Sequence, residues 1–309
     1  MIASPNRTKR RDPGRARVTP RELVGLGFIA KAQPVATCAY QHLLGMSRAV
    51  ARRSLRKLRD LGLVGVNVVA MELPSRYVLG PQAPQVLGRV TGHDPEEFRV
   101  PRGIGKVNLD HHDGTVELYV SLRLATARST TIHLEEFVFE DEIRRTTGAP
   151  KGALVPDAVA VFRGQDGRRL AIAFEVDTGS QNPRQVAQRK GLGYAELRAA
   201  RAPLRGCADW LVCCLTNSER RRNKIVGALW DAGVPEGLWY LGMPEAITDR
   251  TILGDAWVTA RVQPTSASAA LVHESPLQPV ITDCDNRSHR STAGFAKEAD
   301  HILNDGVRD

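Results

Sequence analysis

One β-hairpin pattern with acidic ends, over residues 155–177, constrains the fold of this chain more than any other segment. Two apolar runs of strand length flank a Gly-Gln-Asp-Gly turn, which is the sequence form of a β-hairpin. Asp157 opens the first strand, and Glu175 and Asp177 close the second. Because the outer ends of antiparallel strands meet and residues two apart share a face, we expect the three acids to lie together. Three carboxylates repel one another unless a cation joins them, so the segment predicts a divalent metal site.

The overall charge is the next constraint on function. The 309 residues carry a formal net charge of +9, which favours nucleic acid as a partner, although a merely soluble basic protein can have the same composition. No apolar run approaches the ~20 residues of a membrane span, and the N-terminus lacks the apolar core of a signal peptide. Five scattered cysteines fit reduced thiols better than a zinc site. We therefore expect a cytoplasmic protein that does not engage a membrane.

Local composition divides the chain into five parts. Residues 1–18 form a basic arm and residues 263–309 a polar tail, and both are predicted to be disordered. Residues 83–105 are rich in Pro and Gly and predict a linker, with a short helix over residues 83–90. The remaining parts, residues 19–82 and 106–262, have the apolar periodicity of two folded domains.

The first domain reads as three helices followed by two strands. The helices are predicted to begin at residues 20, 35 and 48, with capping residues before the first and the third. The strands are predicted over residues 64–71 and 76–79. This order resembles a winged helix-turn-helix domain, in which the third helix is the recognition helix.

Basic side chains follow the third predicted helix and the wing. Those near the helix N-terminus are candidates for base edges: Arg48, Arg52 and Arg53. Those further along are candidates for phosphate contacts: Arg56, Lys57 and Arg59. Arg76, in the wing, is a candidate for the adjacent groove or backbone. The alternative is a solvated basic face that binds no DNA; the short turn, the arginine stripe and the wing together favour double-stranded DNA.

The second domain has the order helix, strand, strand opening with Pro-Asp, strand closing with Glu-x-acid, helix, strand, which resembles the PD-(D/E)XK nuclease superfamily. The segments Leu-Val-Pro-Asp at 154–157 and Phe-Glu-Val-Asp-Thr-Gly at 174–179, joined to the N-terminal pattern, resemble the replication-relaxation family of plasmids and mobile elements over about residues 19–245. The resemblance implies an α/β (α+β) chain with a restriction-endonuclease-like mixed sheet. It also implies a role in replication, DNA relaxation or mobilisation, with a relaxase or replication protein as a partner.

The resemblance also assigns roles to residues of the hairpin. Asp157 and Glu175 match the superfamily's ligands for Mg²⁺ or Mn²⁺, and the carbonyl of Val176 matches its backbone ligand. Asp177 departs from the pattern, because the superfamily has a lysine there to act on water or phosphate. Metal-dependent cleavage of a phosphodiester is the activity implied.

A substitute cation is expected from the helix predicted over residues 183–201. Lys190 and Tyr194 match the spacing of an element of RecB-like nucleases and would face the same way. Arg184 and Gln188 are other candidates from that helix.

Other polar residues of the second domain carry weaker signals. Glu117, on a helix predicted over residues 113–127, loosely matches a helix acid of some superfamily members. The pair His111 and His112 is predicted to cap or pack, because no third ligand of a histidine metal site can be placed from the sequence.

Two functions of different class remain open. One is a metal-dependent endonuclease, for which Asp157 and Glu175 argue. The other is a catalytically inactive regulator or relaxase accessory that binds DNA with a nuclease-like fold, for which the acid at position 177 argues. The oligomeric state is left open.

Overall fold

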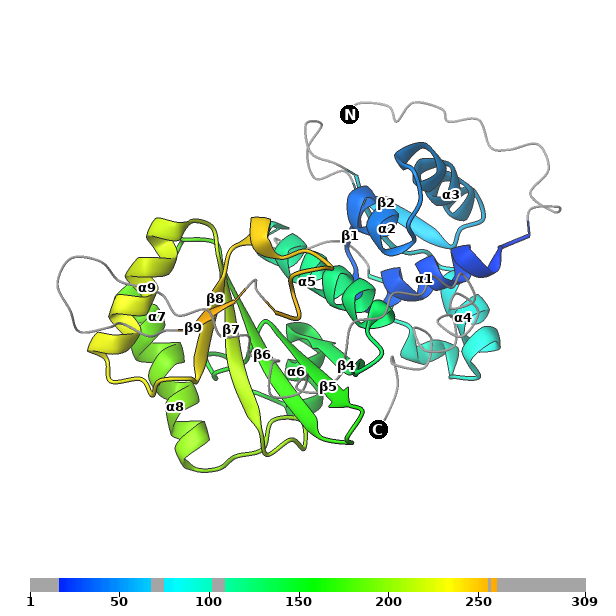
Figure 1. The fold of residues 1–309 in the computed structure, drawn as a ribbon. Helices are drawn as coiled ribbons and strands as arrows, with labels where there is room; N and C mark the ends of the chain where they lie inside the picture. The colour runs from blue at the N-terminus through cyan, green and yellow to red at the C-terminus, as the bar shows by residue number, and fades with distance from the viewer. Residues whose placement is uncertain (1–16, 68–74, 102–108, 255–256, 260–309) are drawn as a thin grey trace. The chain divides into compact units, whose positions relative to one another are not determined.

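The computed structural model describes residues 17–67, 75–101, 109–254 and 257–259, and the chain divides into two compact units at residue 107 (Figure 1). Both units contain helices and strands, which confirms a mixed α/β class. Residues 1–16 of the predicted basic arm and the predicted polar tail lie outside the described residues. Within those residues, no helix has the length and apolar character needed to cross a membrane.

The N-terminal unit combines short helices with a small antiparallel sheet. Its elements are α1 (Pro20–Ala32), β1 (Val35–Ala36), α2 (Thr37–Leu43), α3 (Arg48–Asp60), β2 (Val64–Asn67), β3 (Arg76–Leu79) and α4 (Ala83–Thr91), followed by a 3-10 turn, η2 (Pro95–Glu97). The strands lie in the order β1-β3-β2. Thr19 and Ser47 cap α1 and α3 as the sequence predicts. The predicted start of the second helix is wrong, because Val35 and Ala36 pair with β3 instead.

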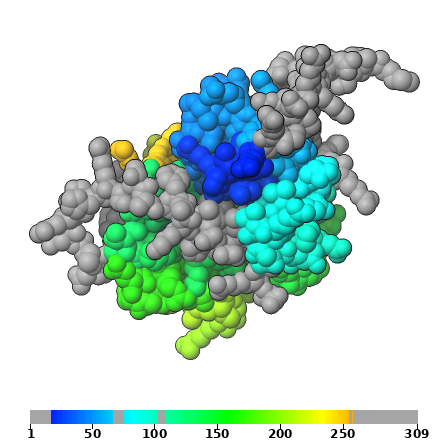
Figure 2. All heavy atoms as spheres, turned by 90° about the vertical axis from the view of Figure 1, so that its right-hand side faces the viewer, coloured from blue at the N-terminus to red at the C-terminus, as the bar shows by residue number. Residues whose placement is uncertain are grey.

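Helix α4 confirms the short helix predicted at the start of the linker stretch, and it packs against α1. Ala83 and Leu87 on α4 are fully buried. Figure 2 shows the dark-blue atoms of α1 adjoining the cyan atoms that include α4. A helix in a Pro- and Gly-rich segment therefore completes the core of the N-terminal unit, because burial of its apolar face outweighs the local composition.

The C-terminal unit is built on one six-stranded sheet. The strands are β4 (Ile132–Phe139), β5 (Ala158–Gly164), β6 (Arg169–Asp177), β7 (Trp210–Thr216), β8 (Trp239–Gly242) and β9 (Val258–Thr259), hydrogen-bonded in that order. The helices are α5 (Leu109–Arg128), α6 (Glu140–Thr147), α7 (Pro183–Val186), α8 (Leu192–Ala199) and α9 (Glu219–Asp231). A π-helical segment, η3 (Ala187–Gly191), joins α7 to α8, and a 3-10 turn, η4 (Pro244–Ala246), follows β8.

The hairpin predicted over residues 155–177 is present as β5 and β6. The two strands are antiparallel, with Ala158 opposite Phe174, and the Asp157 amide donates to the Phe174 carbonyl at 3.0 Å. β6, β7 and β8 are parallel to one another. The sheet is therefore mixed, and the start of β5 lies beside the end of β6.

The two faces of the sheet are covered by different helices. On one face Val159 and Ala173 belong to a buried cluster that includes Ile225 and Leu229 of α9. On the other face Phe137 lies 4.9 Å from Tyr119 of α5, measured between ring centroids. Figure 1 shows α5 and the α7–α9 helices on opposite sides of the strands. Burial on both faces holds the strand ends that carry the acids in fixed positions.

Several helix predictions of this unit differ from the structure in their bounds. The helix predicted from residue 113 begins at Leu109, so His111 and His112 lie in its first turn. Gly114 also lies in the first turns of α5. A Cβ there would meet a methyl group of Val176 at 3.0 Å, so glycine lets α5 approach β6 closely. The helix predicted over residues 183–201 is interrupted by η3.

Candidate functional site

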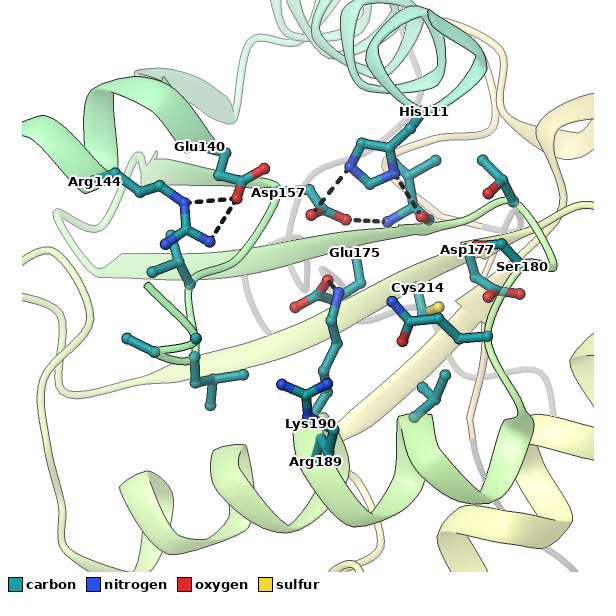
Figure 3. Close-up of a pocket in the computed structure, with 18 residues that line it drawn as sticks. His111, Glu140, Arg144, Asp157, Glu175, Asp177, Ser180, Arg189, Lys190 and Cys214 are labelled. Carbon is teal, nitrogen blue, oxygen red and sulfur yellow. Dashed lines mark hydrogen bonds and ion pairs between the residues drawn. The ribbon is translucent and has the colours of Figure 1, made fainter. Parts of the chain in front are cut away.

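A pocket of about 410 Å³ opens where β5 begins and β6 ends (Figure 3). Its lining includes five of the six predicted catalytic or ligand positions of the hairpin and helix: Asp157, Glu175, Val176, Asp177 and Lys190. Tyr194 lies behind Glu175 and is fully buried. Sequence and structure therefore bring the predicted residues of the second domain to one place.

Asp157 forms the centre of one wall of the pocket. Its Oδ2 accepts the backbone N–H of Val176 at 2.7 Å, and its Oδ1 lies 3.1 Å from Nε2 of His111. Burial alone would raise the pKa of this carboxyl, but the hydrogen bond from His111 and the charge of Lys190 lower it below its usual value. Asp157 is therefore held as a buried carboxylate.

Glu175 is the most enclosed acid of the pocket, with 2% of its surface exposed. Tyr194 donates its hydroxyl to Oε1 at 2.6 Å, and Lys190 forms an ion pair with Oε2. Burial and the neighbouring charge of Asp157 raise the pKa of Glu175 to about 8, against the opposing effect of Lys190. Burial, more than any neighbouring charge, therefore opposes the ionised form of Glu175.

The π-helical segment and the helix after it supply both partners of the Glu175 carboxylate. Lys190 lies within η3, and Tyr194 follows on α8. Burial would lower the pKa of Lys190, but the charges of Glu175 and Asp157 raise it above its usual value. A Cβ at Gly191 would lie 2.7 Å from Leu229, so glycine lets this segment pack closely on α9. Single π turns are frequent at functional sites.

Asp177 is paired with an arginine that the sequence did not identify as its partner. Arg221 of α9 donates its Nε to Oδ2 at 2.6 Å and one terminal nitrogen to Oδ1 at 2.8 Å. The same terminal nitrogen also donates to the carbonyl of Gln181. The prediction that three acids share one cation is therefore incomplete, because a buried guanidinium already neutralises Asp177. This pair ties the end of β6 to the pocket loop at Gln181 and to α9.

Removing this pair is expected to destabilise the C-terminal unit. Asp177→Ala and Arg221→Ala each break a bidentate contact with little exposure of either side chain, so we expect losses of about 1.5–3 kcal/mol. In a double-mutant cycle on urea unfolding, the double variant should cost much less than the sum of the single variants. Strictly additive losses would show that the two side chains do not stabilise each other.

His111 is the main residue of the site that the sequence pattern missed. It was predicted to cap or pack, but its Nε2 faces Asp157 and its Nδ1 lies 2.9 Å from the carbonyl of Val176. The hydrogen bond to Asp157 raises the pKa of His111 against the effect of burial. The only signal in the sequence was the His-His pair itself; its use depends on where α5 begins.

Glu140 is a second residue without a signal in the sequence. It begins α6, directly after β4, and its Oε1 accepts Nε of Arg144 at 2.8 Å. Ligand atoms of His111, Glu140 and Asp157 all lie within 4.8 Å of one another. By contrast, Glu117, Arg184 and Gln188 are not among the described residues that line this pocket.

The predicted DNA-contacting side chains of the N-terminal unit differ in how exposed they are. Those exposed on α3 are Arg48, Arg52, Arg53 and Arg56. Arg59 is half-buried and lies 3.5 Å from Asp60.

Lys57 and Arg76 are placed differently from these arginines. The Lys57 ammonium contacts Glu22 of α1 at 2.7 Å, and it lowers the pKa of Glu22 against the effect of burial. Arg76 is 5% exposed at the start of β3. Both side chains are turned into the unit, a placement that depends on tertiary packing and is not visible in a local charge pattern.

Comparison with known proteins identifies one family. The family model described as replication-relaxation matches residues 26–208, more than half of the chain, which confirms the resemblance seen in the sequence. The match spans α3 of the N-terminal unit and the pocket residues from α5 to α8. Searches of curated proteins and of solved structures returned no significant match.

Proposed function

The chain belongs to the replication-relaxation family, and from this premise we propose that it binds double-stranded DNA of a plasmid or mobile element and cleaves it with a divalent cation. The observation that carries the proposal is the pocket in which Asp157, Glu175 and Lys190 converge. Its role would lie in replication or DNA relaxation. A relaxase or replication protein is the partner proposed for such a step.

For the N-terminal unit we propose a winged helix-turn-helix. The order α1, β1, α2, α3, β2, β3 with the sheet order β1-β3-β2 supports it. In that fold α3 is the helix that enters the major groove. The exposed Arg48, Arg52, Arg53 and Arg56 on α3 supply the positive charge for phosphates and base edges.

For the C-terminal unit we propose a PD-(D/E)XK-like fold, supported by a helix, a three-stranded antiparallel start and a parallel strand after an intervening helix. Its donor set fits Mg²⁺ or Mn²⁺, because two carboxylates face one pocket and the pKa of Glu175 is raised to about 8 partly by Asp157. Such a cation, when bound, would polarise the phosphate and activate water. The Val176 carbonyl, also predicted as a ligand, has His111 as a partner.

Lys190 takes the place of the missing strand lysine in this proposal. Its ammonium lies in the pocket and forms an ion pair with Glu175. The carboxylates of Glu175 and Asp157 favour its charged form. A fixed positive charge there stabilises the negative charge that develops on a phosphate during cleavage. Tyr194 holds Glu175 in place through its other oxygen.

The alternative function is DNA binding without cleavage. It is favoured by Asp177, which stands where the superfamily has a lysine and is neutralised by Arg221. The two functions make the same prediction for duplex binding and opposite predictions for strand cleavage.

Cleavage of supercoiled plasmid separates these two functions. We expect nicked or linear product with Mg²⁺ or Mn²⁺ and none with a chelator. The double variant Asp157→Asn/Glu175→Gln, purified identically, controls for a contaminating nuclease and should be inactive. Equal activity of the wild type and the double variant, or inactivity of both, would reject cleavage by this pocket.

The DNA-binding surface is tested by salt dependence. Arg52→Ala/Arg56→Ala should weaken duplex binding and lower the slope of log K against log salt by about one unit, because Arg56 is the candidate for a phosphate contact and each lost phosphate contact removes about one. Fluorescence anisotropy at several salt concentrations measures both quantities.

A matched control removes the same charge elsewhere on the same unit. Arg89 and Arg99 are exposed outside α3, so Arg89→Ala/Arg99→Ala should leave the slope nearly unchanged. If both double variants change the slope equally, net charge and not α3 accounts for binding.

A further inference from the structure

We propose that the pocket has a cation position built by His111, Glu140 and Asp157, and that it prefers a first-row transition-metal ion such as Mn²⁺ to Mg²⁺. The inference rests on the proposed metal-dependent function and deepens it. Candidate ligand atoms of these three residues lie within 4.8 Å of one another. Figure 3 shows Asp157 between Glu140 and His111 at the pocket.

The hydrogen bond of His111 to β6 prepares one ring nitrogen for a ligand. A backbone carbonyl can only accept, so Nδ1, at 2.9 Å from the Val176 oxygen, carries a proton. Nε2 then faces Asp157 Oδ1 at 3.1 Å, where either a proton or a cation must lie between the two atoms. Histidines that bind metals usually donate their other N–H to a carbonyl or carboxylate in this way.

Three separate elements hold the three ligands. His111 is in the first turn of α5, Glu140 begins α6, and Asp157 precedes β5. The Val176 amide fixes the second oxygen of Asp157 at 2.7 Å. Arg144 contacts Oε1 of Glu140 through two nitrogens at 2.8 Å each. Oε2 of Glu140 can therefore turn to a cation while the pair with Arg144 is retained.

The donor set determines which cation is preferred. Carboxylate oxygens are suitable ligands for both Mg²⁺ and Mn²⁺. An imidazole nitrogen, in contrast, favours transition-metal ions. Glu175 contributes differently, because both of its oxygens are bound by Lys190 and Tyr194. The position at His111 and Glu140 shares Asp157 with Glu175, so a cation bound there would add positive charge beside these carboxylates, where a phosphate would approach.

Spectroscopy of the full-length protein with Mn²⁺ tests the position directly. Electron spin echo envelope modulation should show coupling of the bound Mn²⁺ to a ring nitrogen. The coupling should be lost in His111→Gln and kept in His112→Gln. Calorimetry should show Mn²⁺ binding weakened at least about tenfold in His111→Gln and in Glu140→Gln, with the neighbouring Asp141→Asn as the matched control.

The outcomes separate this inference from the proposed function. Nitrogen coupling that survives His111→Gln, or Mn²⁺ affinity unchanged in Glu140→Gln, would overturn the position. If DNA is still cleaved in that case, the proposed function stands. If the nitrogen coupling and the affinity losses are found but DNA is not cleaved, the position stands and the proposed function fails. His111→Ala and thermal unfolding of each variant separate lost ligands from lost folding.

Discussion

Lys190→Met is expected to reduce the rate of metal-dependent DNA cleavage by about 10²–10³-fold, because it removes a fixed positive charge from the place where negative charge develops on phosphate. Duplex binding through α3 should be unchanged. The variant should fold at neutral pH, since Glu175, with a pKa of about 8, can keep its proton when its ion pair is lost. Single-turnover cleavage with saturating Mn²⁺ measures the rate of the chemical step.

Two further variants make the Lys190 result specific. Lys224 is an exposed lysine on α9, so Lys224→Met removes the same charge from the same unit and should cleave at the wild-type rate. Lys190→Arg keeps the charge but replaces a compact ammonium with a planar fork, and it should recover only part of the rate. Wild-type cleavage by Lys190→Met would assign the role to another group of the pocket.

Much of the fold could be predicted because its signals are local. The hairpin of β5 and β6 combines two apolar runs with a Gly- and Asp-containing turn, and both are read directly from neighbouring residues. Asp157 and Glu175 occupy fixed ends of that hairpin, so their convergence followed from register alone. The same logic placed Lys190 and Tyr194 on one side of a helix.

The parts that could not be predicted depend on contacts distant in sequence. His111 reaches Val176 and Asp157 only because α5 starts earlier than its pattern suggests. Asp177 finds its partner on α9, more than forty positions along the chain. A carboxylate and a guanidinium at that separation give no joint signal in a single sequence.

Surface charge on α3 shows the same limit in the other unit. Lys57 and Arg56 are neighbours in sequence, but only Lys57 reaches Glu22 of α1. A basic stripe therefore indicates the helix that presents charge, while packing against α1 decides which members of the stripe are available. Fewer residues of α3 are therefore available to contact DNA than the basic stripe in the sequence indicates.

The free energy of unfolding of the metal-free C-terminal unit is expected to fall as the pH rises from about 5 to about 8. The pKa of Glu175 is about 8 in the folded protein and 4.5 by its ordinary value, so between these values only the folded state keeps the proton. Unfolding then releases a proton, and stability falls by up to about 1.4 kcal/mol per pH unit from this group.

The histidine beside Asp157 acts in the same direction. The pKa of His111 is raised above 6.5, so its contribution is complete below that pH and is lost as the pH rises through its folded pKa. The pKa of Asp157 is lowered below 3.8, and this carboxylate is ionised in both states above pH 5. Asp157 therefore does not oppose the fall in the free energy of unfolding between pH 5 and 8.

Tryptophan fluorescence can isolate this effect, because all four tryptophans lie in the C-terminal unit: Trp210, Trp230, Trp239 and Trp257. Urea unfolding with a chelator at pH 5, 6, 7 and 8 should give a descending stability in the wild type and a much flatter one in Glu175→Gln. The exposed Glu96→Gln, in the N-terminal unit, should follow the wild type. A flat wild-type profile, or an equal slope in Glu175→Gln, would mean that Glu175 is already ionised at pH 5, and that Lys190 outweighs the burial of its carboxyl.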